Sequence, residues 1–291
     1  MAPTNLPNAV LATTVEPWPV SIVRVRIDNL IRYVQIHMDL LAPERNIIKG
    51  DDPQILKMRF EPGVKCFLMD KETLALQPSL IQLGGLQKID PHLLPVPSHP
   101  VTHDYESFTL LSNLRKGRDM LCVVEHPALA HRGKMWRKIA EMPGHFFGGG
   151  LRCSIEHKAA RDAIMHRHLS ELGLGVAPEF YGHVVEEGRG IIGFIYEHVE
   201  GAQNLRDLQQ AGHQLTDADL QKVRDVVKKL HDNGFNHGNL LPHNIFRRPD
   251  GSMYLVDFAN TYRDGMEPQE GTAAHLRDLD LIALRGLQNG A

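Results

Sequence analysis

The sequence predicts an α+β fold, and three observations support this prediction. Short apolar segments with partial alternation dominate the first hundred residues, two long segments with helical periodicity lie further along the chain, and a turn signal at 249–251 joins two short apolar segments. The length of 291 residues is enough for two domains or lobes. Four prolines within 91–100 cannot continue a helix or a central strand, so we expect a linker there that ends a β-rich N-terminal extension over residues 1–100.

The N-terminal extension is predicted to consist mainly of strands. A turn signal at 61–63 separates the last two of them. The segment 28–41 also tolerates an amphipathic helix, so two interpretations stay open for it. The predicted strands are 21–27, 33–39, 54–60 and 64–69. No chemistry can be assigned to this part of the chain.

The middle of the chain is predicted to place strands around one long helix. Residues 154–172 have helical periodicity, and Gly173 and Gly175 follow as helix stops. The expected inward face carries Ile155, Ala159, Ala163, Ile164, Leu169 and Leu172. The predicted strands of this region are 108–114, 119–126, 134–140, 181–185 and 190–197.

The last part of the chain is predicted to hold two helices and a hairpin. Thr216 can cap a helix over 216–233, because Asp219 lies three residues later as in a capping box. The hairpin is predicted from strands 244–248 and 252–257. A final helix over 272–287 is expected to turn Leu276, Leu279, Ile282 and Ala283 inward.

Composition excludes several classes of function. The 32 basic and 35 acidic side chains give no global field for nucleic acid or anionic lipid, so no DNA partner is expected. Three scattered cysteines form neither a disulfide framework nor a zinc motif. The N-terminal residues lack the pattern of a signal peptide, and no apolar run approaches the ~20 residues of a membrane span. We therefore expect a cytoplasmic protein with no membrane span.

The chemistry is expected near the predicted hairpin. Asn244 and Asp257 lie thirteen residues apart, at its two ends. Two oxygen-bearing side chains at neighbouring strand ends can share a hard cation such as Mg²⁺ together with phosphate oxygens. The alternative is that both side chains only cap turns.

The same stretch resembles the catalytic loop and metal-binding motif of the protein-kinase-like superfamily. That pattern is His-x-Asp, four residues, Asn, a short hairpin and then Asp-Phe-Gly. The chain has His237-Gly-Asn239, then Asn244 at the same spacing, then Asp257-Phe-Ala259. The closer likeness is to the divergent members, namely aminoglycoside phosphotransferases, bacterial lipopolysaccharide-core kinases and fungal kinase-like proteins. These often carry Gly at the position of Gly238.

The resemblance implies a two-lobe protein-kinase-like fold, with a small lobe over 101–201 and a minimal C-terminal lobe over 202–291. It implies that Lys138 holds nucleotide phosphates and that Glu156 is its ion-pair partner. The backbone around Glu197 and Val199 would meet an adenine base. Further implied roles are a buried brace for His237, metal binding for Asn244 and Asp257, and ATP and Mg²⁺ as cofactors.

Departures from the kinase pattern leave three functions open. Asn239 stands where an active kinase has an Asp, and an amide cannot accept the proton of the attacking hydroxyl. Ala259 replaces the Gly of the motif, no glycine-rich phosphate loop precedes Lys138, and only 34 residues follow Asp257, too few for a full protein-kinase lobe. The first hypothesis is an ATP- and Mg²⁺-dependent phosphotransferase acting on a small molecule. The second is a pseudokinase that binds nucleotide or a protein partner and works as a scaffold or regulator. The third is a kinase fold repurposed for nucleotidyl transfer or amide formation.

Overall fold

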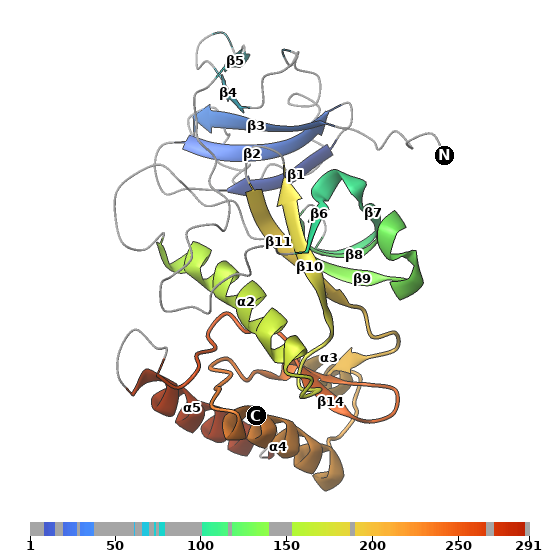
Figure 1. The fold of residues 1–291 in the computed structure, drawn as a ribbon, viewed down its shortest axis with the longest axis vertical. Helices are drawn as coiled ribbons and strands as arrows, with labels where there is room; N and C mark the ends of the chain where they lie inside the picture. Colours follow the sequence, from blue (N-terminus) through green and yellow to red (C-terminus); the bar gives the residue numbers. More distant parts are fainter. Residues whose placement is uncertain are drawn as a thin grey trace.

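A computed structural model gives the fold of the chain, and its mixed α and β content agrees with the predicted α+β class (Figure 1). The structure describes residues 9–14, 20–27, 30–37, 61, 66–69, 73, 76–78, 101–115, 118–139, 153–186, 190–265 and 271–288. The described strands form a five-stranded, a six-stranded and a three-stranded sheet. The Pro-rich segment 91–100 and the predicted strand 54–60 lie outside the described residues.

The first sheet is built from the N-terminal segments. Its strands follow one another in chain order as β1 (Ala9–Thr14), β2 (Val20–Ile27), β3 (Leu30–His37), β4 (Cys66–Met69) and β5 (Leu76–Pro78). The helical interpretation of 28–41 is wrong, because β3 pairs with β2 from Leu30 to His37 without a break. Tertiary pairing thus decides a segment whose local pattern allowed either structure.

The second sheet has the order β6-β10-β11-β9-β8-β7. Its strands are β6 (Thr102–Asp104), β7 (Thr109–Arg115), β8 (Arg118–Glu125), β9 (Met135–Ile139), β10 (Phe180–Glu186) and β11 (Gly190–Glu197), with short 3-10 turns at Tyr105–Ser107 and Pro127–Arg132. Five of these strands lie where the sequence predicts them. Strand β9 lies between β8 and β11, so its residues occupy the middle of the sheet.

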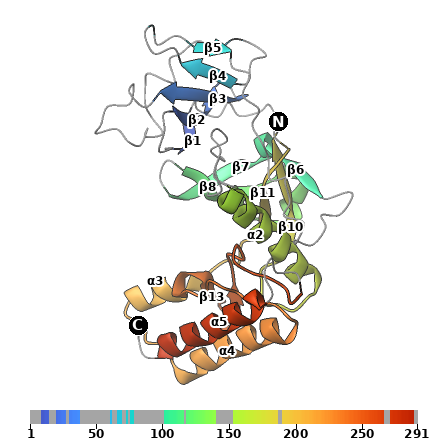
Figure 2. The ribbon, with the colours of Figure 1, turned by 90° about the vertical axis from the view of Figure 1, so that its left-hand side faces the viewer.

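A buried polar contact joins the first sheet to the second. Arg24 of β2 donates to Glu186 of β10 at 2.6 Å, and the two residues are 1% and 3% exposed. The Tyr33 hydroxyl donates to the same carboxylate, and the Arg24 guanidinium lies 4.1 Å from the centre of the Tyr105 ring. Figures 1 and 2 show the first sheet beyond one end of the second, with β1 nearest to it, and β1 contacts β8.

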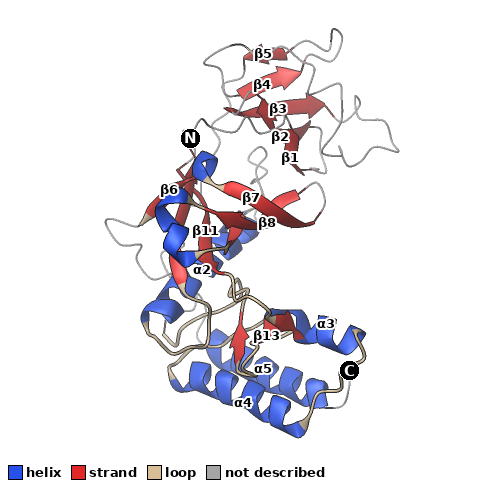
Figure 3. Ribbon diagram, turned by 90° about the vertical axis from the view of Figure 1, so that its right-hand side faces the viewer, coloured by secondary structure: helices blue, strands red, loops and turns tan. Residues whose placement is uncertain are grey.

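The helices gather beyond the six-stranded sheet, as Figure 3 shows. Helix α2 (Cys153–Glu171) lies against β10 and β11, whereas α3 (Leu205–Gln210), α4 (Asp217–Asp232) and α5 (Thr272–Gln288) surround a small sheet. That sheet consists of β12 (Gln203–Asn204), β13 (Ile245–Arg247) and β14 (Met253–Leu255), and a 3-10 turn at Pro242–Asn244 precedes β13. The predicted capping box of α4 is confirmed, because Thr216 and Asp219 exchange side-chain and backbone hydrogen bonds.

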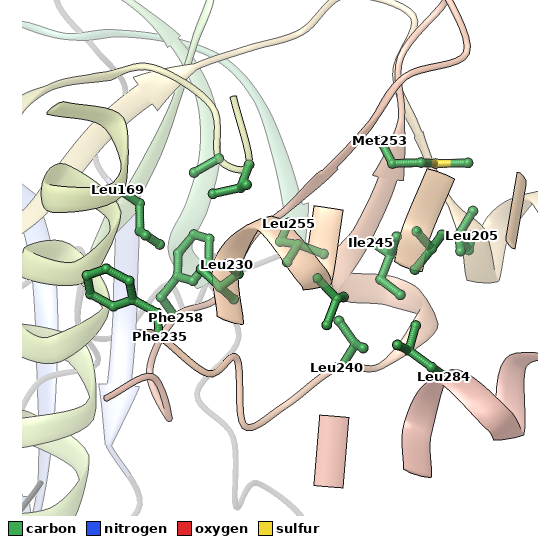
Figure 4. Packing of buried hydrophobic residues seen from close by; sticks show 14 of the residues in the cluster. Leu169, Leu205, Leu230, Phe235, Leu240, Ile245, Met253, Leu255, Phe258 and Leu284 are labelled. Atoms are coloured by element: carbon green, nitrogen blue, oxygen red, sulfur yellow. The ribbon is translucent and has the colours of Figure 1, made fainter. Parts of the chain in front are cut away.

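One apolar cluster holds the helices to the hairpin (Figure 4). Leu230 of α4, Leu255 of β14 and Phe258 are all fully buried in it. Phe258 directly follows Asp257, so the core fixes the end of the hairpin that carries the predicted metal-binding carboxylate. Replacing a buried Phe by Ala typically costs about 3–5 kcal/mol of stability.

The predicted inward face of the last helix is wrong in part. Leu279 and Ile282 are 41% and 58% exposed, whereas Leu284 and Leu287 are buried. The helix is turned so that Asp280, 1% exposed, faces the protein interior. Leu172 at the end of α2 is also exposed, contrary to its predicted inward position, and the side chains of Ile155 and Ala159 lie outside the described residues.

Candidate functional site

Lys138 joins the six-stranded sheet to two carboxylates from other elements. Its Nζ lies 2.6 Å from Oδ2 of Asp162 on α2 and 2.8 Å from Oδ1 of Asp257, which follows β14. The Oδ1 of Asp162 also accepts the backbone N–H of Phe258 at 2.7 Å. One lysine and one buried aspartate therefore tie β9, α2 and the hairpin end together.

The three charges shift each other's protonation. Burial favours the neutral form of Lys138, but Asp162 and Asp257 outweigh it and raise its pKa. Burial raises the pKa of Asp162. Burial also opposes ionisation of Asp257, yet the ammonium of Lys138 outweighs it and lowers the pKa of this carboxyl. The site therefore keeps a cation and an ionised carboxylate in contact at neutral pH.

Gly193 allows the strand carrying Lys138 to pack closely against its neighbour. Gly193 of β11 pairs with Ile139 of β9. A Cβ atom added at Gly193 would lie 2.2 Å from the carbonyl oxygen of Lys138, which is too close for any side chain. The glycine therefore helps to set the position of Lys138.

One buried acid of α5 holds the loop at 237–239 through hydrogen bonds. Asp280 accepts the backbone N–H of His237 at 2.7 Å and that of Gly238 at 2.9 Å, and His231 Nε2 lies 3.0 Å from its carboxylate. Gly238 has φ +70, and an added Cβ would lie 2.7 Å from the carbonyl oxygen of Asn260. Only glycine suits this position, because both the left-handed backbone and the close approach exclude a side chain.

His237 braces the same loop from the other side. It is fully buried, and its Nε2 lies 3.1 Å from the carbonyl oxygen of Val256, while its Nδ1 accepts the N–H of Asn239 at 3.3 Å. Burial lowers the pKa of His237, so the ring is neutral at pH 7. A neutral ring that donates at Nε2 and accepts at Nδ1 satisfies both contacts.

Asn239 lies beside the hairpin carboxylate and points its amide at it. Its Nδ2 donates to Oδ2 of Asp257 at 3.1 Å, and Asn244 donates its own Nδ2 to the backbone carbonyl of Asn239 at 2.9 Å. The N–H of Val256 donates to the carbonyl of Asn244 at 3.0 Å. These bonds bring the loop, the 3-10 turn and the hairpin end into one constellation.

Asp257 adopts a backbone conformation that L-residues rarely use. Its φ is +69, and it is the one non-glycine residue with positive φ among those the structure describes. Such conformations persist where the surroundings hold them, and they concentrate at functional sites. Here the buried Phe258 on one side and the contacts of the Asp257 carboxylate with Lys138 and Asn239 on the other hold the residue in place.

A cavity of about 330 Å³ opens at this constellation. Its size is at the lower end of the range of ligand pockets. Two groups of elements line it. The strands of the six-stranded sheet and α2 form one side, and β12, β13, β14 and their flanking residues form the other. The lining side chains are Leu121, Trp136, Lys138, Asp162, His166, Phe194, Tyr196, Asn204, His243, Asn244, Phe246, Tyr254, Val256 and Asp257.

The donor set fits a hard cation bound with phosphate. A carboxylate and an amide side chain, those of Asp257 and Asn244, line the same cavity as the ammonium of Lys138. Each carboxylate oxygen of Asp257 has a second lone pair beside the one used by Lys138 or Asn239. Mg²⁺ typically takes one or two protein ligands and completes its shell with phosphate oxygens and water. No group of three or more His, Cys, Asp or Glu suited to a metal occurs among the described residues.

The predicted site residues separate into three groups. Lys138, Asn244 and Asp257 line the cavity, and Asn239 and His237 contact its rim through hydrogen bonds. Glu197 and Val199 do not line it; Glu197 accepts the N–H of Glu179 instead.

Sequence reasoning missed two carboxylates of this site. The side chain of Glu156 lies outside the described residues, so its predicted pairing with Lys138 stays a prediction. Among the described residues, Lys138 pairs with Asp162, six residues further along α2, as well as with Asp257. Asp280 was also missed. The sequence offered one signal, because each acid lies among apolar residues in a segment with helical periodicity; in the structure each is 1% exposed.

Comparison with protein families gives a match that covers the site. A family described as the lipopolysaccharide kinase (Kdo/WaaP) family matches residues 124–281, which is more than half of the chain. The matched range includes Lys138, Asp162, the loop at 237–239, Asp257 and Asp280. No curated protein matches the sequence. Among the described residues, no helix has both the length and the apolar character needed to cross a bilayer.

Proposed function

Because the chain belongs to the lipopolysaccharide kinase (Kdo/WaaP) family, a group of kinase-like phosphotransferases, we propose that it uses ATP and Mg²⁺ to phosphorylate a hydroxyl group of a small molecule. One observation carries the proposal: Lys138, Asn244 and Asp257 line the same cavity. In this proposal the six-stranded sheet with α2 is a small lobe within 101–201, and the helices with the hairpin form a minimal lobe within 202–291.

Each residue has a role that its chemistry supports. Lys138 binds phosphate oxygens, and its ion pair with the buried Asp162 fixes the ammonium beside the cavity. Asn244 and Asp257 hold Mg²⁺, which neutralises charge on the transferring phosphoryl group when bound. Asp280 and His237 position the loop that carries Asn239.

Asn239 determines how fast the proposed phosphoryl transfer is expected to be. Its side chain can orient the acceptor hydroxyl but cannot take up the proton. General-base catalysis typically contributes about 10²–10⁴-fold, so slow turnover is expected from positioning and charge stabilisation alone. The loose transition state of phosphoryl transfer makes this feasible, because it demands little of a base.

A second candidate is a pseudokinase that binds nucleotide and acts through a protein partner. The hydrogen bond from Asn239 to Asp257 favours it, because the amide stabilises the charge of Asp257 in the absence of metal. The two candidates share the nucleotide site and differ in turnover.

Ligand-induced stabilisation tests the shared site first. ATP with Mg²⁺ should stabilise the full chain by mass action, adding about 2.7 kcal/mol to the free energy of unfolding at a ligand concentration of 100 Kd, and the unfolding temperature should rise accordingly. Asp257→Asn should remove most of the Mg²⁺-dependent part. Asp278→Asn is the matched control, because Asp278 is an exposed acid on α5. Absence of any shift would refute both candidates.

Product analysis then separates the candidates. Release of ADP with phosphorylation of an added small-molecule alcohol or sugar, lost in Asp257→Asn, supports the phosphotransferase. Binding without ATP consumption supports the pseudokinase. Release of AMP or pyrophosphate would contradict both and indicate nucleotidyl or ligase chemistry.

A further inference from the structure

The segment 258–264 follows the candidate metal ligand Asp257 and is bonded to the loop at 234–238. The N–H of Asn236 donates to the carbonyl of Tyr262 at 3.3 Å, and the N–H of Tyr262 donates to the Asn236 side chain at 2.9 Å. The loop therefore fixes the path of the chain after the metal ligand. Further bonds between the two stretches are Asn236 Nδ2 to the carbonyl of Asn260 at 3.2 Å, Thr261 Oγ1 to the carbonyl of His237 at 3.2 Å and the N–H of Asp264 to the carbonyl of Gly234 at 2.8 Å.

Helix α2 holds the same segment through two consecutive residues, Arg161 and Asp162. The guanidinium of Arg161 donates to the carbonyl of Ala259 at 3.1 Å, and Asp162 accepts the N–H of Phe258 at 2.7 Å. The Arg161 guanidinium also lies 4.1 Å from the centre of the Tyr262 ring. Arg161 is buried, so water competes little for these contacts. One arginine of α2 therefore binds the segment both at its backbone and at a ring.

The backbone conformation of Asp257 requires such support. Its φ of +69 lies in the left-handed region, which non-glycine residues adopt only where their surroundings enforce it. Directly before it, the N–H of Val256 is bonded to the carbonyl of Asn244. Directly after it, the N–H of Phe258 and the carbonyl of Ala259 are the groups that α2 binds. The backbone is thus fixed on both sides of Asp257, and its carboxylate lines the cavity.

We propose that Arg161 is a positioning residue for the metal-binding carboxylate. By holding the carbonyl of Ala259, it keeps Asp257 in the left-handed conformation that directs the carboxylate to Mg²⁺. This inference rests on the proposed function and adds a residue of α2 to the support of the metal site. Without Arg161, Asp257 can relax to an ordinary backbone conformation, and the population that can bind metal falls. The apparent affinity for the Mg²⁺ complex of the nucleotide falls by the same factor.

The contacts of Arg161 separate its role from that of the neighbouring acid. The carboxylate of Asp162 is shared between the N–H of Phe258 and the ammonium of Lys138, so its substitution would disturb phosphate binding as well. Arg161 does not line the cavity, and its contacts with Ala259 and with the Tyr262 ring lie after the metal ligand in the chain. A change of Arg161 therefore acts on the metal ligand without removing a group from the phosphate site.

Calorimetric titration of the full chain with Mg²⁺·ATP and with metal-free ATP tests the proposal. Arg161→Gln should weaken Mg²⁺·ATP binding about 5- to 150-fold, the factor that corresponds to the usual energy of a residue strained in this way. Binding of ATP in the presence of a chelator should not fall, because the ion pair of Lys138 with Asp162 does not involve Arg161. Arg161→Lys keeps a cation that can donate to the carbonyl and should restore part of the affinity.

Two further variants complete the design. Arg167→Gln is the matched control, because Arg167 is a buried arginine of the same helix that pairs with Glu171 of α2, and it should leave both affinities unchanged. Tyr262→Leu removes the ring beside the Arg161 guanidinium and should weaken Mg²⁺·ATP binding selectively, to a smaller extent than Arg161→Gln. Thermal unfolding verifies that each variant is folded. If Arg161→Gln does not fold, Tyr262→Leu provides the same comparison.

The outcomes separate this inference from the function on which it rests. If the wild-type chain binds Mg²⁺·ATP more tightly than metal-free ATP, a selective loss in Arg161→Gln supports the inference. If the variant instead changes neither affinity or lowers both equally, Arg161 does not position the metal ligand, and only the inference fails. If the wild-type chain binds neither form of ATP, or binds both alike, the proposed metal and nucleotide site is wrong and the inference fails with it.

Discussion

Substitution of Asp280 by Asn tests whether this buried carboxylate holds the loop at 237–239 in place. The carboxylate of Asp280 accepts two backbone N–H groups of the loop, those of His237 and Gly238, and also contacts His231. An amide offers one oxygen in place of two, and its NH₂ group is a donor. At least one buried N–H of the loop therefore loses its acceptor in Asp280→Asn, whichever way the amide turns.

The expected cost follows from this count. An unsatisfied buried donor costs about 1–3 kcal/mol, and the remaining bonds weaken because the acceptor is no longer charged, by about 1 kcal/mol. We expect Asp280→Asn to lower the free energy of unfolding by about 3 kcal/mol, a large share of the 5–15 kcal/mol typical of a folded domain. At about 2–4 °C per kcal/mol, the unfolding temperature should fall by about 6–12 °C.

Urea unfolding followed by circular dichroism measures this loss. Asp278→Asn on the same helix serves as the reference, because Asp278 is exposed and its substitution should change stability by less than about 0.5 kcal/mol. The affinity for Mg²⁺·ATP should fall in Asp280→Asn as well, because the loop positions Asn239 against Asp257. Equal stability of the two variants would refute the assigned role of Asp280.

Three further predictions concern the same part of the chain. Thr216→Ala removes the capping box of α4 and should lower the free energy of unfolding by about 1 kcal/mol in a denaturant titration. Asn239→Asp places a second carboxylate beside Asp257, so thermal unfolding should show lower stability without metal and a larger Mg²⁺-induced stabilisation than in the wild type. Burial lowers the pKa of His166 to about 3, whereas an unfolded histidine titrates near 6.5. The unfolded chain therefore takes up a proton that the folded chain refuses, stability should fall as pH drops from about 6.5 towards 3, and His166→Phe should show a shallower fall.

Local sequence signals were sufficient for most elements near the site. The capping residues of α4, the turn signal of the hairpin and the alternation of β9 each act over a few residues, so their positions could be predicted from the chain alone. The spacing of Asn244 and Asp257 likewise pointed to two side chains that share one cavity in the structure.

The contacts that were missed depend on helix rotation and long-range packing. Asp162 and Asp280 face inward because helices α2 and α5 dock with those faces against Lys138 and the loop at 237–239. Periodicity favoured Leu279 and Ile282 as inward residues of α5, since it ranks apolar side chains above an acid. An acid that satisfies two backbone N–H groups reverses that ranking, and no local pattern reveals those partners.

The contact of Arg24 and Tyr33 with Glu186 bears on how the protein should be dissected. A fragment trimmed to the matched range 124–281 would lose both residues and keep Glu186 at the tip of β10. Removing the partner of a buried charge commonly lowers the free energy of unfolding by about 3–5 kcal/mol, which is enough to unfold a marginally stable fragment. Expression of such a fragment would therefore report on a missing counterion rather than on whether the matched region folds on its own, and Glu186→Gln should accompany a deletion that removes Arg24.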